Sequence, residues 1–476
     1  MEKINLKGVS FKYPERTNCA LSDITLSVSQ GELCAVIGKS ASGKSTLLRL
    51  LKDELAPFGT LDGKIKINGS VGFVMQNFEE GMVTNSVLSE LEFAPANAGL
   101  SADEIQLLVA ECAAYFNLEK SLNADISALS GGKKQILALA SVMIMKPDIL
   151  VLDEPASQLD PVAKAEFFDI LRSMHKDFNT TIVLATHNAE NVFDIADTIA
   201  VLDDSKLLIK DEKNVVVNYL KEQNNPLLFA LPARVRYGKI NKKELPIDDS
   251  EPSVAIKAKN ICFAYEKGAD VLNALNFKAY KNKINAIIGC NAGGKTTLLK
   301  VLCGVKSAYR GSVKSSGKIS MLTQNVYNTF TKDTCGEEVQ FGDLTDYLEI
   351  SDIKDFHPYD ISGGQAQRLA LSKVLATGAD IILLDEPTTG LDCVMKKKLG
   401  ELLKDLCTQG KTVILVTHDL EFAGNFADYT SFLSGGKIVS TMKTGDLFRR
   451  LTLYTTPLSR LTDGEVIADF EVGESV

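Results

Sequence analysis

Two stretches of this sequence share one pattern of glycines, a lysine and hydroxyl side chains. Residues 38–46 read GKSASGKST, and residues 289–297 read GCNAGGKTT. Each stretch ends a short apolar run, ELCAVIG in the first case and KINAIIG in the second. Apolar residues at helical spacing follow, as in KSTLLRLL. The pattern therefore predicts a buried strand, a glycine-rich turn and a helix, at two places in the chain.

This strand–loop–helix pattern predicts a phosphate-binding loop. Glycines let successive backbone N–H groups point at an anion, and the helix that follows adds the positive end of its dipole. Lys44 and Lys295 are expected to neutralise the β- and γ-phosphates of ATP, while Ser45 and Thr296 offer a hydroxyl to Mg²⁺. The predicted nucleotide-binding residues of the loops are Gly38, Lys39, Ser40, Ala41, Ser42, Gly43, Lys44, Ser45 and Thr46, with Gly289, Cys290, Asn291, Ala292, Gly293, Gly294, Lys295, Thr296 and Thr297.

A pair of adjacent carboxylates follows each loop at the end of another apolar run. Asp153 and Glu154 end DILVLDEP, and Asp385 and Glu386 end DIILLDEP. The first member of each pair is expected near Mg²⁺, and the second is expected to orient and deprotonate the attacking water. The sequence therefore predicts two sites of ATP hydrolysis.

Two of the four histidines also occupy matching places. His187 lies in ATHN and His418 in VTHD, each directly after an apolar strand-like run. A neutral imidazole at the end of such a strand can contact the γ-phosphate and position the water. We interpret both histidines as catalytic residues.

The whole chain is a tandem duplication. Matched positions are separated by 251 residues at the loop lysines (295 − 44) and by 232 residues at the aspartates (385 − 153). We predict a first domain at residues 1–240 with a C-terminal tail, a linker at 241–253 and a second domain at 254–476. The continuous apolar runs predict an α/β fold with a parallel sheet covered on both faces. An inserted helical lobe is expected near residues 77–125, where SADEIQ opens with a Ser-x-x-Glu capping box.

These motifs resemble the ATP-binding-cassette (ABC) ATPases over nearly the whole chain. The resemblance implies an antiparallel β subdomain and a helical lobe beside each parallel core. It also implies that an aromatic ring stacks on adenine, that a glutamine bridges Mg²⁺ and a transmembrane partner, and that an aspartate links the two sites. The residues that match these roles are Tyr13 and Tyr265, Gln76 and Gln324, and Asp160 and Asp392, respectively.

The family's signature sequence appears twice as LSGGK, at Leu129–Lys133 and at Leu433–Lys437. The first copy opens an apolar helix pattern, so its amides predict an anion site at a helix N-terminus. The second copy separates two strand-like runs, so Gly435 and Gly436 predict a hairpin turn and no nucleotide contact. The true second signature is ISGGQ. The predicted signature residues are Ser130, Gly131 and Gly132, with Ser362, Gly363 and Gly364.

The resemblance implies that the two domains pair head to tail with two ATP molecules between them. Ser362 and Gly364 would then cap the ATP at Lys44, and Ser130 and Gly132 the ATP at Lys295. Lys133 stands where the family usually has glutamine, as at Gln365. Either a phosphate from the opposite domain offsets the unfavourable helix dipole at this lysine, or the side chain points to solvent and the difference is silent.

The segments after Gln76 and Gln324 resemble those of energy-coupling-factor (ECF) importers. Residues 76–101 read QNFEEGMVTNSVLSELEFAPANAGLS, echoed by QNVYNTFTKDTCGEEVQFGD. The resemblance implies a motor subunit for uptake of a vitamin or metal ion. Its partners would be an integral membrane scaffold (T-type) protein and a membrane substrate-binding (S-type) protein. Two alternatives remain, a duplicated sugar-importer ATPase and a soluble, ribosome-associated ABC translation factor.

Composition limits the remaining possibilities. The net charge of −9 argues against a nucleic-acid partner, which usually needs a basic surface. Nine cysteines without a Cys-x-x-Cys pair exclude zinc ribbons by spacing and fit a reducing cytosol. The N-terminus has no signal-peptide pattern, and no apolar run approaches the length of a membrane span. We expect a cytoplasmic protein that is peripheral on the inner face of the cell membrane.

Overall fold

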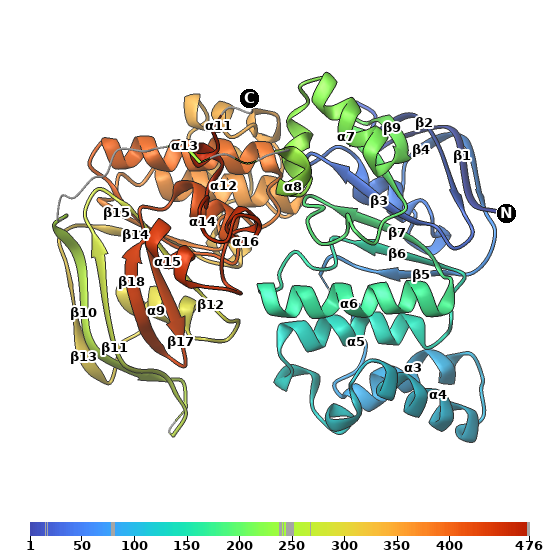
Figure 1. Cartoon of the computed structure of the whole chain (residues 1–476), viewed down its shortest axis with the longest axis horizontal. Coiled ribbons are helices and arrows are strands. Elements are labelled where there is room, and N and C mark those ends of the chain that lie inside the picture. Colours follow the sequence, from blue (N-terminus) through green and yellow to red (C-terminus); the bar gives the residue numbers. More distant parts are fainter. Residues whose placement is uncertain are drawn as a thin grey trace. The chain divides into compact units, whose positions relative to one another are not determined.

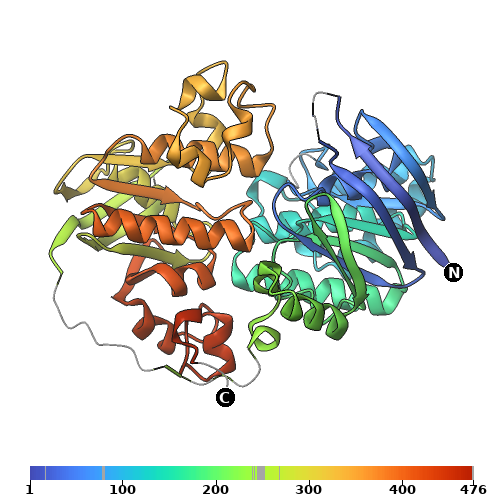
Figure 2. The same cartoon turned by 90° about the horizontal axis from the view of Figure 1, so that it is seen from above.

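The computed structural model describes residues 1–14, 16, 18–77, 81–237, 240, 242–243, 252–266 and 268–473. The chain divides into two compact units, Met1–Arg236 and Tyr237–Val476. The division lies just before the predicted linker, and most of residues 241–253 fall outside the described residues. Figures 1 and 2 show each unit as a sheet-based core with helices packed against it.

The first unit is built on a six-stranded sheet in the order β5-β6-β7-β3-β8-β9. Neighbouring strands are parallel except for β8 and β9, which are antiparallel. All residues of β3, β6 and β7 are buried, which explains their uninterrupted apolar sequences. The strands are β3 (Leu33–Gly38), β5 (Val71–Val74), β6 (Ile149–Asp153), β7 (Thr181–Thr186), β8 (Thr198–Asp203) and β9 (Lys206–Glu212).

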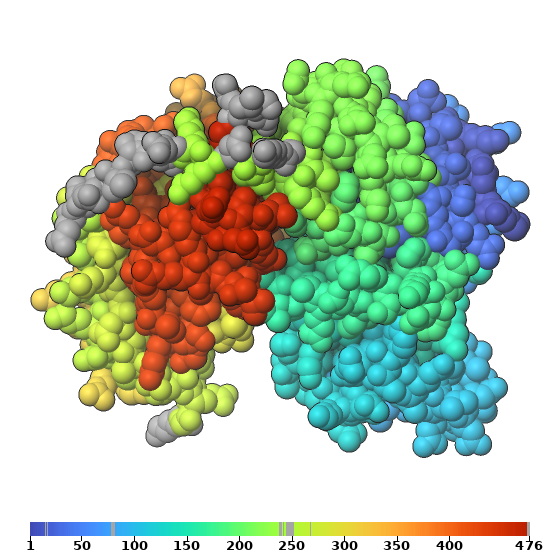
Figure 3. Space-filling model, in the orientation of Figure 1, coloured from blue at the N-terminus to red at the C-terminus, as the bar shows by residue number. Residues whose placement is uncertain are grey.

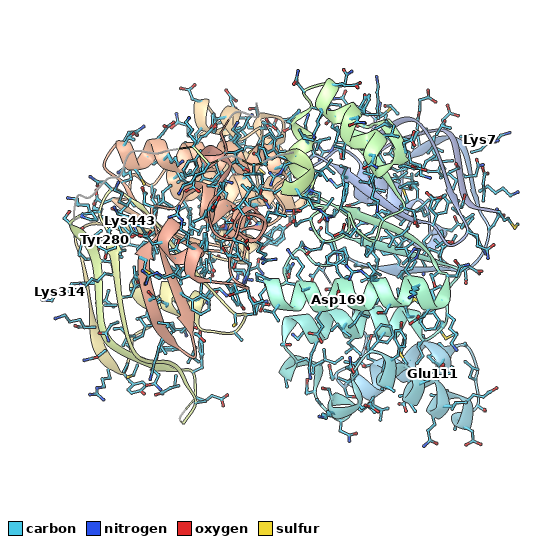
Figure 4. All side chains as sticks on the ribbon, in the orientation of Figure 1. Lys7, Glu111, Asp169, Tyr280, Lys314 and Lys443 are labelled. Carbon is cyan, nitrogen blue, oxygen red and sulfur yellow. The ribbon has the colours of Figure 1, made fainter. Side chains whose placement is uncertain are left out.

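A second, antiparallel sheet in the order β2-β1-β4 covers the start of the first unit. Its strands are β1 (Glu2–Lys12), β2 (Leu21–Ser29) and β4 (Thr60–Ile67). Buried and exposed residues largely alternate along β1 and β2, as expected for a sheet with one face on the core. Lys7 on β1 extends away from the core (Figure 4). The antiparallel subdomain implied by the family resemblance is therefore present.

The helices of the first unit include the predicted lobe, which protrudes from the unit in Figure 3. Ser101 and Glu104 form the predicted capping box at the start of α4. Within the described residues, no helix has the length and hydropathy needed to cross a membrane. The helices are α1 (Lys44–Arg49), η1 (Asp53–Leu55), α3 (Val87–Asn97), α4 (Ala102–Tyr115), η2 (Glu119–Ser121), η3 (Ile126–Ala128), α5 (Gly131–Met143), α6 (Pro161–Phe178), α7 (Lys213–Glu222), η4 (Pro226–Ala230) and α8 (Ala233–Arg236).

The second unit repeats both sheets with the same strand order. The large sheet is β14-β15-β16-β12-β17-β18 and the antiparallel sheet is β11-β10-β13. Lys314 on β13 extends outward much as Lys7 does in the first unit (Figure 4). The strands are β10 (Val254–Ala264), β11 (Asp270–Tyr280), β12 (Ile284–Gly289), β13 (Arg310–Ser315), β14 (Ile319–Leu322), β15 (Ile381–Asp385), β16 (Thr412–Val416), β17 (Tyr429–Ser434) and β18 (Lys437–Lys443).

The helical lobe is where the two units differ most. In place of the long α3 and α4, the second unit has only short helices between β14 and α12. This matches the roughly sixteen residues that its sequence lacks in this region. The helices are α9 (Lys295–Leu302), η5 (Val326–Thr329), α10 (Cys335–Glu338), α11 (Asp343–Tyr347), η6 (Ser351–Ile353), α12 (Gly363–Leu375), α13 (Cys393–Thr408), α14 (Leu420–Phe426), α15 (Thr444–Arg450), α16 (Pro457–Leu461) and η7 (Asp469–Glu471).

The two LSGGK copies differ as predicted. Ser130 caps α5, whereas Gly435 and Gly436 connect the antiparallel strands β17 and β18. Both glycines have positive φ, 55° and 73°, the conformation of a two-residue type I′ turn. In the first unit the same turn is made by Asp204 and Ser205, also at positive φ. The second copy is therefore a hairpin.

Candidate functional site

The parallel register of the core strands brings the predicted site residues to one edge of each sheet. In the first unit, β3 pairs with β7 at Ile37 and Thr186, and β6 pairs with β7 at Asp153 and Ala185. The loop after β3 and the histidine after β7 therefore lie beside Asp153. In the second unit, Asp385 pairs with Val416, so β15, β16 and β12 repeat the arrangement.

The backbone of each glycine-rich loop is tightly confined. Gly43 and Gly294, both at φ 98°, precede α1 and α9 in the left-handed conformation that favours glycine. A Cβ atom built on Gly38 would lie 2.2 Å from the carbonyl oxygen of Leu202, and one on Gly289 2.1 Å from that of Leu433. The loops therefore require glycine where they leave the sheet, and their amides curl over the helix N-terminus.

The loop lysines are buried and held by the loop itself. Lys44 Nζ donates to the carbonyl oxygens of Gly38 (2.9 Å) and Lys39 (2.8 Å). Lys295 Nζ donates to those of Gly289 (2.9 Å) and Cys290 (2.8 Å). Each ammonium group is thus fixed in the hollow of its loop, which is the place required for neutralising a phosphate.

His187 connects this lysine to the predicted base of the first unit. Its Nδ1 lies 3.2 Å from Lys44 Nζ and 3.2 Å from the carbonyl oxygen of Gly38. Its Nε2 lies 3.4 Å from Oε1 of Glu154. The imidazole therefore spans the space between the phosphate-binding loop and the carboxylate.

The second unit has a closer contact between the matching pair. His418 Nε2 lies 3.0 Å from Oε1 of Glu386, and the backbone N–H of His418 donates to Oε2 at 3.1 Å. Glu386 is 8% exposed and Glu154 6% exposed. Both glutamates have positive φ, 52° and 48°, which is uncommon for a residue with a side chain. Sequence analysis predicted the pairing but gave no sign of this backbone conformation.

The aspartates before these glutamates are deeply buried. Burial raises the pKa of Asp153, opposed by the Ser45 hydroxyl and the Lys44 ammonium. Burial, helped by the charge of Glu386, raises the pKa of Asp385 to about 6, against the Thr296 hydroxyl and two lysines. Ionisation of each aspartate is thus disfavoured until a cation arrives.

This environment fits Mg²⁺. In the described part of the chain, Oδ1 of Asp153 and both carboxylate oxygens of Asp385 are buried without a hydrogen-bond partner of good geometry. No described group of three His, Cys, Asp or Glu side chains forms a ready-made metal cage. Mg²⁺ is normally held by one or two protein oxygens, its own waters and substrate phosphates, so the hydroxyl–aspartate pairs Ser45–Asp153 and Thr296–Asp385 suit it.

The two predicted adenine-stacking tyrosines lie beside their loops. Tyr13 Oη is 3.1 Å from Oγ1 of Thr46, and Tyr265 Oη is 3.3 Å from Oγ1 of Thr297. Tyr265 is 54% exposed, so its ring is available to a planar ligand. Lys306 lies over the same ring, 5.7 Å from its centroid.

The remaining predicted residues lie at strand ends and helix starts. Gln76 and Gln324 are exposed just after β5 and β14. Ser130 and Ser362 cap α5 and α12, which makes Gly131, Gly132, Gly363 and Gly364 the first turns of those helices. Asp160 and Asp392 cap α6 and α13 through backbone N–H groups.

The two signatures differ at the position after their glycines. Gln365 Oε1 accepts from the backbone N–H of Ser362 at 3.1 Å and completes a capping box. Lys133 cannot accept this bond, and its Nζ donates instead to Oγ of Ser121 at 3.3 Å. Its ammonium group is therefore directed toward its own lobe.

Sequence analysis missed three contacts around these sites. Lys39 forms an ion pair with Asp203 (2.9 Å), whereas its counterpart Cys290 accepts a hydrogen bond from Tyr454 Oη (3.0 Å). Gln367 Nε2 lies 3.4 Å from the carbonyl oxygen of Glu386. None of these pairs is close in sequence, so no local pattern could have indicated them.

Comparison with known proteins identifies the family. Residues 21–157 and 272–389 each match the family model described as ABC transporter. The chain belongs to the ABC transporter ATPases. Because the family model matches twice, the chain is a duplicated ABC ATPase with two tandem cassettes, and the two units of the structure are those cassettes. Members of this family bind and hydrolyse ATP.

Relatives match along the whole chain. A putative ABC transporter ATP-binding protein of Bacillus anthracis is 33% identical over 525 residues, which cover 97% of this chain and 95% of that protein. Another from Methanosarcina acetivorans is 28% identical and covers 94% of this chain and 86% of that protein. Both are described as ATP-binding proteins of transporters.

Solved structures with two cassettes share the fold. The RNase-L inhibitor has a TM-score of 0.67 at 19% identity, covering 93% of this chain and 92% of its own. The structure titled a model of ribosome-bound archaeal Pelota and ABCE1 has a TM-score of 0.71 at 19% identity, covering 93% and 80%. At this identity the likeness concerns the fold alone.

The raised pKa of Asp385 predicts how pH affects stability without nucleotide or metal. Its ionisation is disfavoured in the folded chain, so stability decreases as pH rises from about 4 through about 6. Asp385→Asn removes this cost. We expect the variant to match the parent below pH 4 and to exceed it above pH 7 by up to about 3 kcal/mol. Thermal unfolding in a chelator across this pH range measures the difference, and equal melting curves at pH 7.5 would contradict it.

Proposed function

We propose that this ABC ATPase is the motor subunit of an ECF-type importer for a vitamin or a metal ion. The observation that carries the proposal is the pair of segments after Gln76 and Gln324, whose acidic and aromatic pattern resembles that of ECF ATPases. The relatives described as transporter ATP-binding proteins support the coarser part of this assignment.

The chemistry proposed for each cassette is ATP hydrolysis by an activated water. The loop amides and the buried lysine hold the phosphates, and the tyrosine stacks on adenine. Bound Mg²⁺ would be held by the hydroxyl and aspartate pairs and would neutralise developing phosphate charge. Glu154 and Glu386 take the proton of the attacking water, and His187 or His418 orients that carboxylate from 3.4 or 3.0 Å.

We further propose that each site is completed by the other cassette. Ser362 and Gly364 would cap the ATP at Lys44, and Ser130 and Gly132 the ATP at Lys295. The support is that both signatures start a helix whose first-turn amides are exposed or half-exposed, as an anion site requires. Asp160 and Asp392 would link the two sites.

The proposed membrane contact lies on the segments after the two glutamines. In the first cassette, Val83 is 63% exposed and Phe93 42% exposed, although both are apolar. Such side chains on a helical lobe are suited to burial against a partner. The proposed partners are the T-type scaffold and the S-type substrate-binding protein, with this chain on the cytoplasmic face of the membrane.

Two other functions are open to the same chemistry. A ribosome-associated factor is suggested by the titles of the solved structures above, but their identity of 19% supports the fold alone. Such factors typically carry a long, charged helical linker, whereas residues 221–253 are rich in proline and balanced in charge. A sugar-importer ATPase usually has a degraded second site, whereas both sets of motifs are complete here.

The first test concerns the glutamates. Glu154→Gln and Glu386→Gln together should leave ATP binding intact, because the amide preserves the shape of the side chain. They should slow hydrolysis by about 10²–10⁴-fold, because the base is lost. Glu111→Gln, an exposed change on α4, is the control. Turnover of the double variant at the parental rate would refute the assignment.

The second test concerns location. Expressed with its neighbouring membrane genes, the chain should sediment with membranes and co-purify with an integral partner. Phe93→Ser should weaken this association, whereas Leu107→Ser, at an exposed leucine of α4, should not. Co-sedimentation with ribosomes in place of membranes would favour the translation-factor function.

A further inference from the structure

A buried glutamate holds the segment that follows each glutamine. In the first cassette, Glu90 Oε2 accepts from the backbone N–H groups of Val83 (3.1 Å) and Thr84 (2.8 Å). The Thr84 hydroxyl donates to the same oxygen at 2.8 Å. Glu90 is 4% exposed, so its charge is satisfied almost entirely by this segment.

The second cassette repeats the arrangement with Glu338. Its Oε1 accepts from the backbone N–H groups of Thr331 and Lys332, the latter at 2.6 Å. These donors precede Glu338 by seven and six residues, as Val83 and Thr84 precede Glu90. Each carboxylate is therefore a fastening point for the proposed membrane-contact segment.

Only the second cassette ties this fastening point to the signature helix. Lys373, in the last turn of α12, donates from Nζ to Oε2 of Glu338 (2.5 Å) and to the carbonyl oxygen of Thr329 (2.7 Å). The Glu338 side chain is fully covered. Burial alone would raise the pKa of Glu338, but the hydrogen bonds from Lys373 and the segment's N–H groups outweigh burial and lower it.

The same helix also holds the backbone of the proposed base. Gln367 is 5% exposed, and its Nε2 lies 3.4 Å from the carbonyl oxygens of both Glu386 and Pro387. Lys373 and Gln367 are six residues apart, about 9 Å along the helix axis. One rigid element thus contacts the segment after Gln324 with one side chain and the strand end at Glu386 with another.

The first cassette lacks both connections. Ser141 stands at the position of Lys373, and its hydroxyl donates to Ala138 of its own helix. Gln135 stands at the position of Gln367, and its buried Nε2 has no hydrogen-bond partner among the described residues. The duplication therefore supplies its own reference for what these two contacts do.

We propose that Lys373 and Gln367 are positioning residues through which α12 couples the segment at residues 326–334 to Glu386, and that the first cassette has no such coupling. Contacts at the membrane side would then act on hydrolysis mainly at the Lys295 site. The proposal rests on the proposed function, because that function assigns the segment to a membrane partner and Glu386 to catalysis.

Hydrogen exchange in the isolated chain tests the coupling without any partner. In a chain that carries Glu154→Gln and Glu386→Gln, ATP should reduce deuterium uptake at residues 326–334. Adding Lys373→Ser, which introduces the first cassette's residue, should raise the uptake without ATP and abolish the ATP-dependent difference. Lys373→Arg should preserve that difference, because it keeps the cation.

Controls and outcomes are as follows. Lys397→Ser, at an exposed lysine of α13, should leave the uptake at 326–334 unchanged. Unchanged uptake in β12 shows that each variant is folded. The proposal is overturned if ATP has no effect on residues 326–334, if the effect survives Lys373→Ser, or if residues 81–88 respond equally. Absence from membranes would instead refute the proposed function and leave this result standing.

Discussion

The parallel register of three central strands is the constraint on which both sites depend. Because β3, β7 and β6 run in the same direction and end together, the loop, the histidine and the carboxylates meet at one edge. A shift of one residue in β6 would turn Asp153 to the opposite face of the sheet. Burial on both faces prevents such a shift, since every side chain of these strands is enclosed.

Burial at this edge also sets the electrostatics. The lysine in each loop is covered and held by carbonyl oxygens, which leaves its charge close to the place of the phosphates. The aspartates are kept from ionising easily by the same burial. Without a ligand, each site therefore contains charges in an unfavourable environment, and the binding of a metal–nucleotide complex relieves part of that cost.

Much of this arrangement followed from the sequence because its determinants are local. Glycine spacing fixes the loop, apolar runs fix the buried strands, and Ser130 and Ser362 cap helices that begin directly after them. Contacts between distant segments had no such signal. Glu90, Glu338 and Lys373 looked like surface charges in a polar stretch, and only folding showed the glutamates to be enclosed. The short lobe of the second cassette was expected from its length, although its division into single turns was not.

The positive φ angles of Glu154 and Glu386 have a consequence for how such a chain changes over time. A residue with a side chain costs of order 1–3 kcal/mol in this conformation, whereas glycine and asparagine tolerate it well. Catalysis and robustness therefore impose opposite demands on the same two codons. A mutant library screened only for heat resistance should accumulate glycine or asparagine at these positions, and the survivors would be durable proteins that have lost turnover.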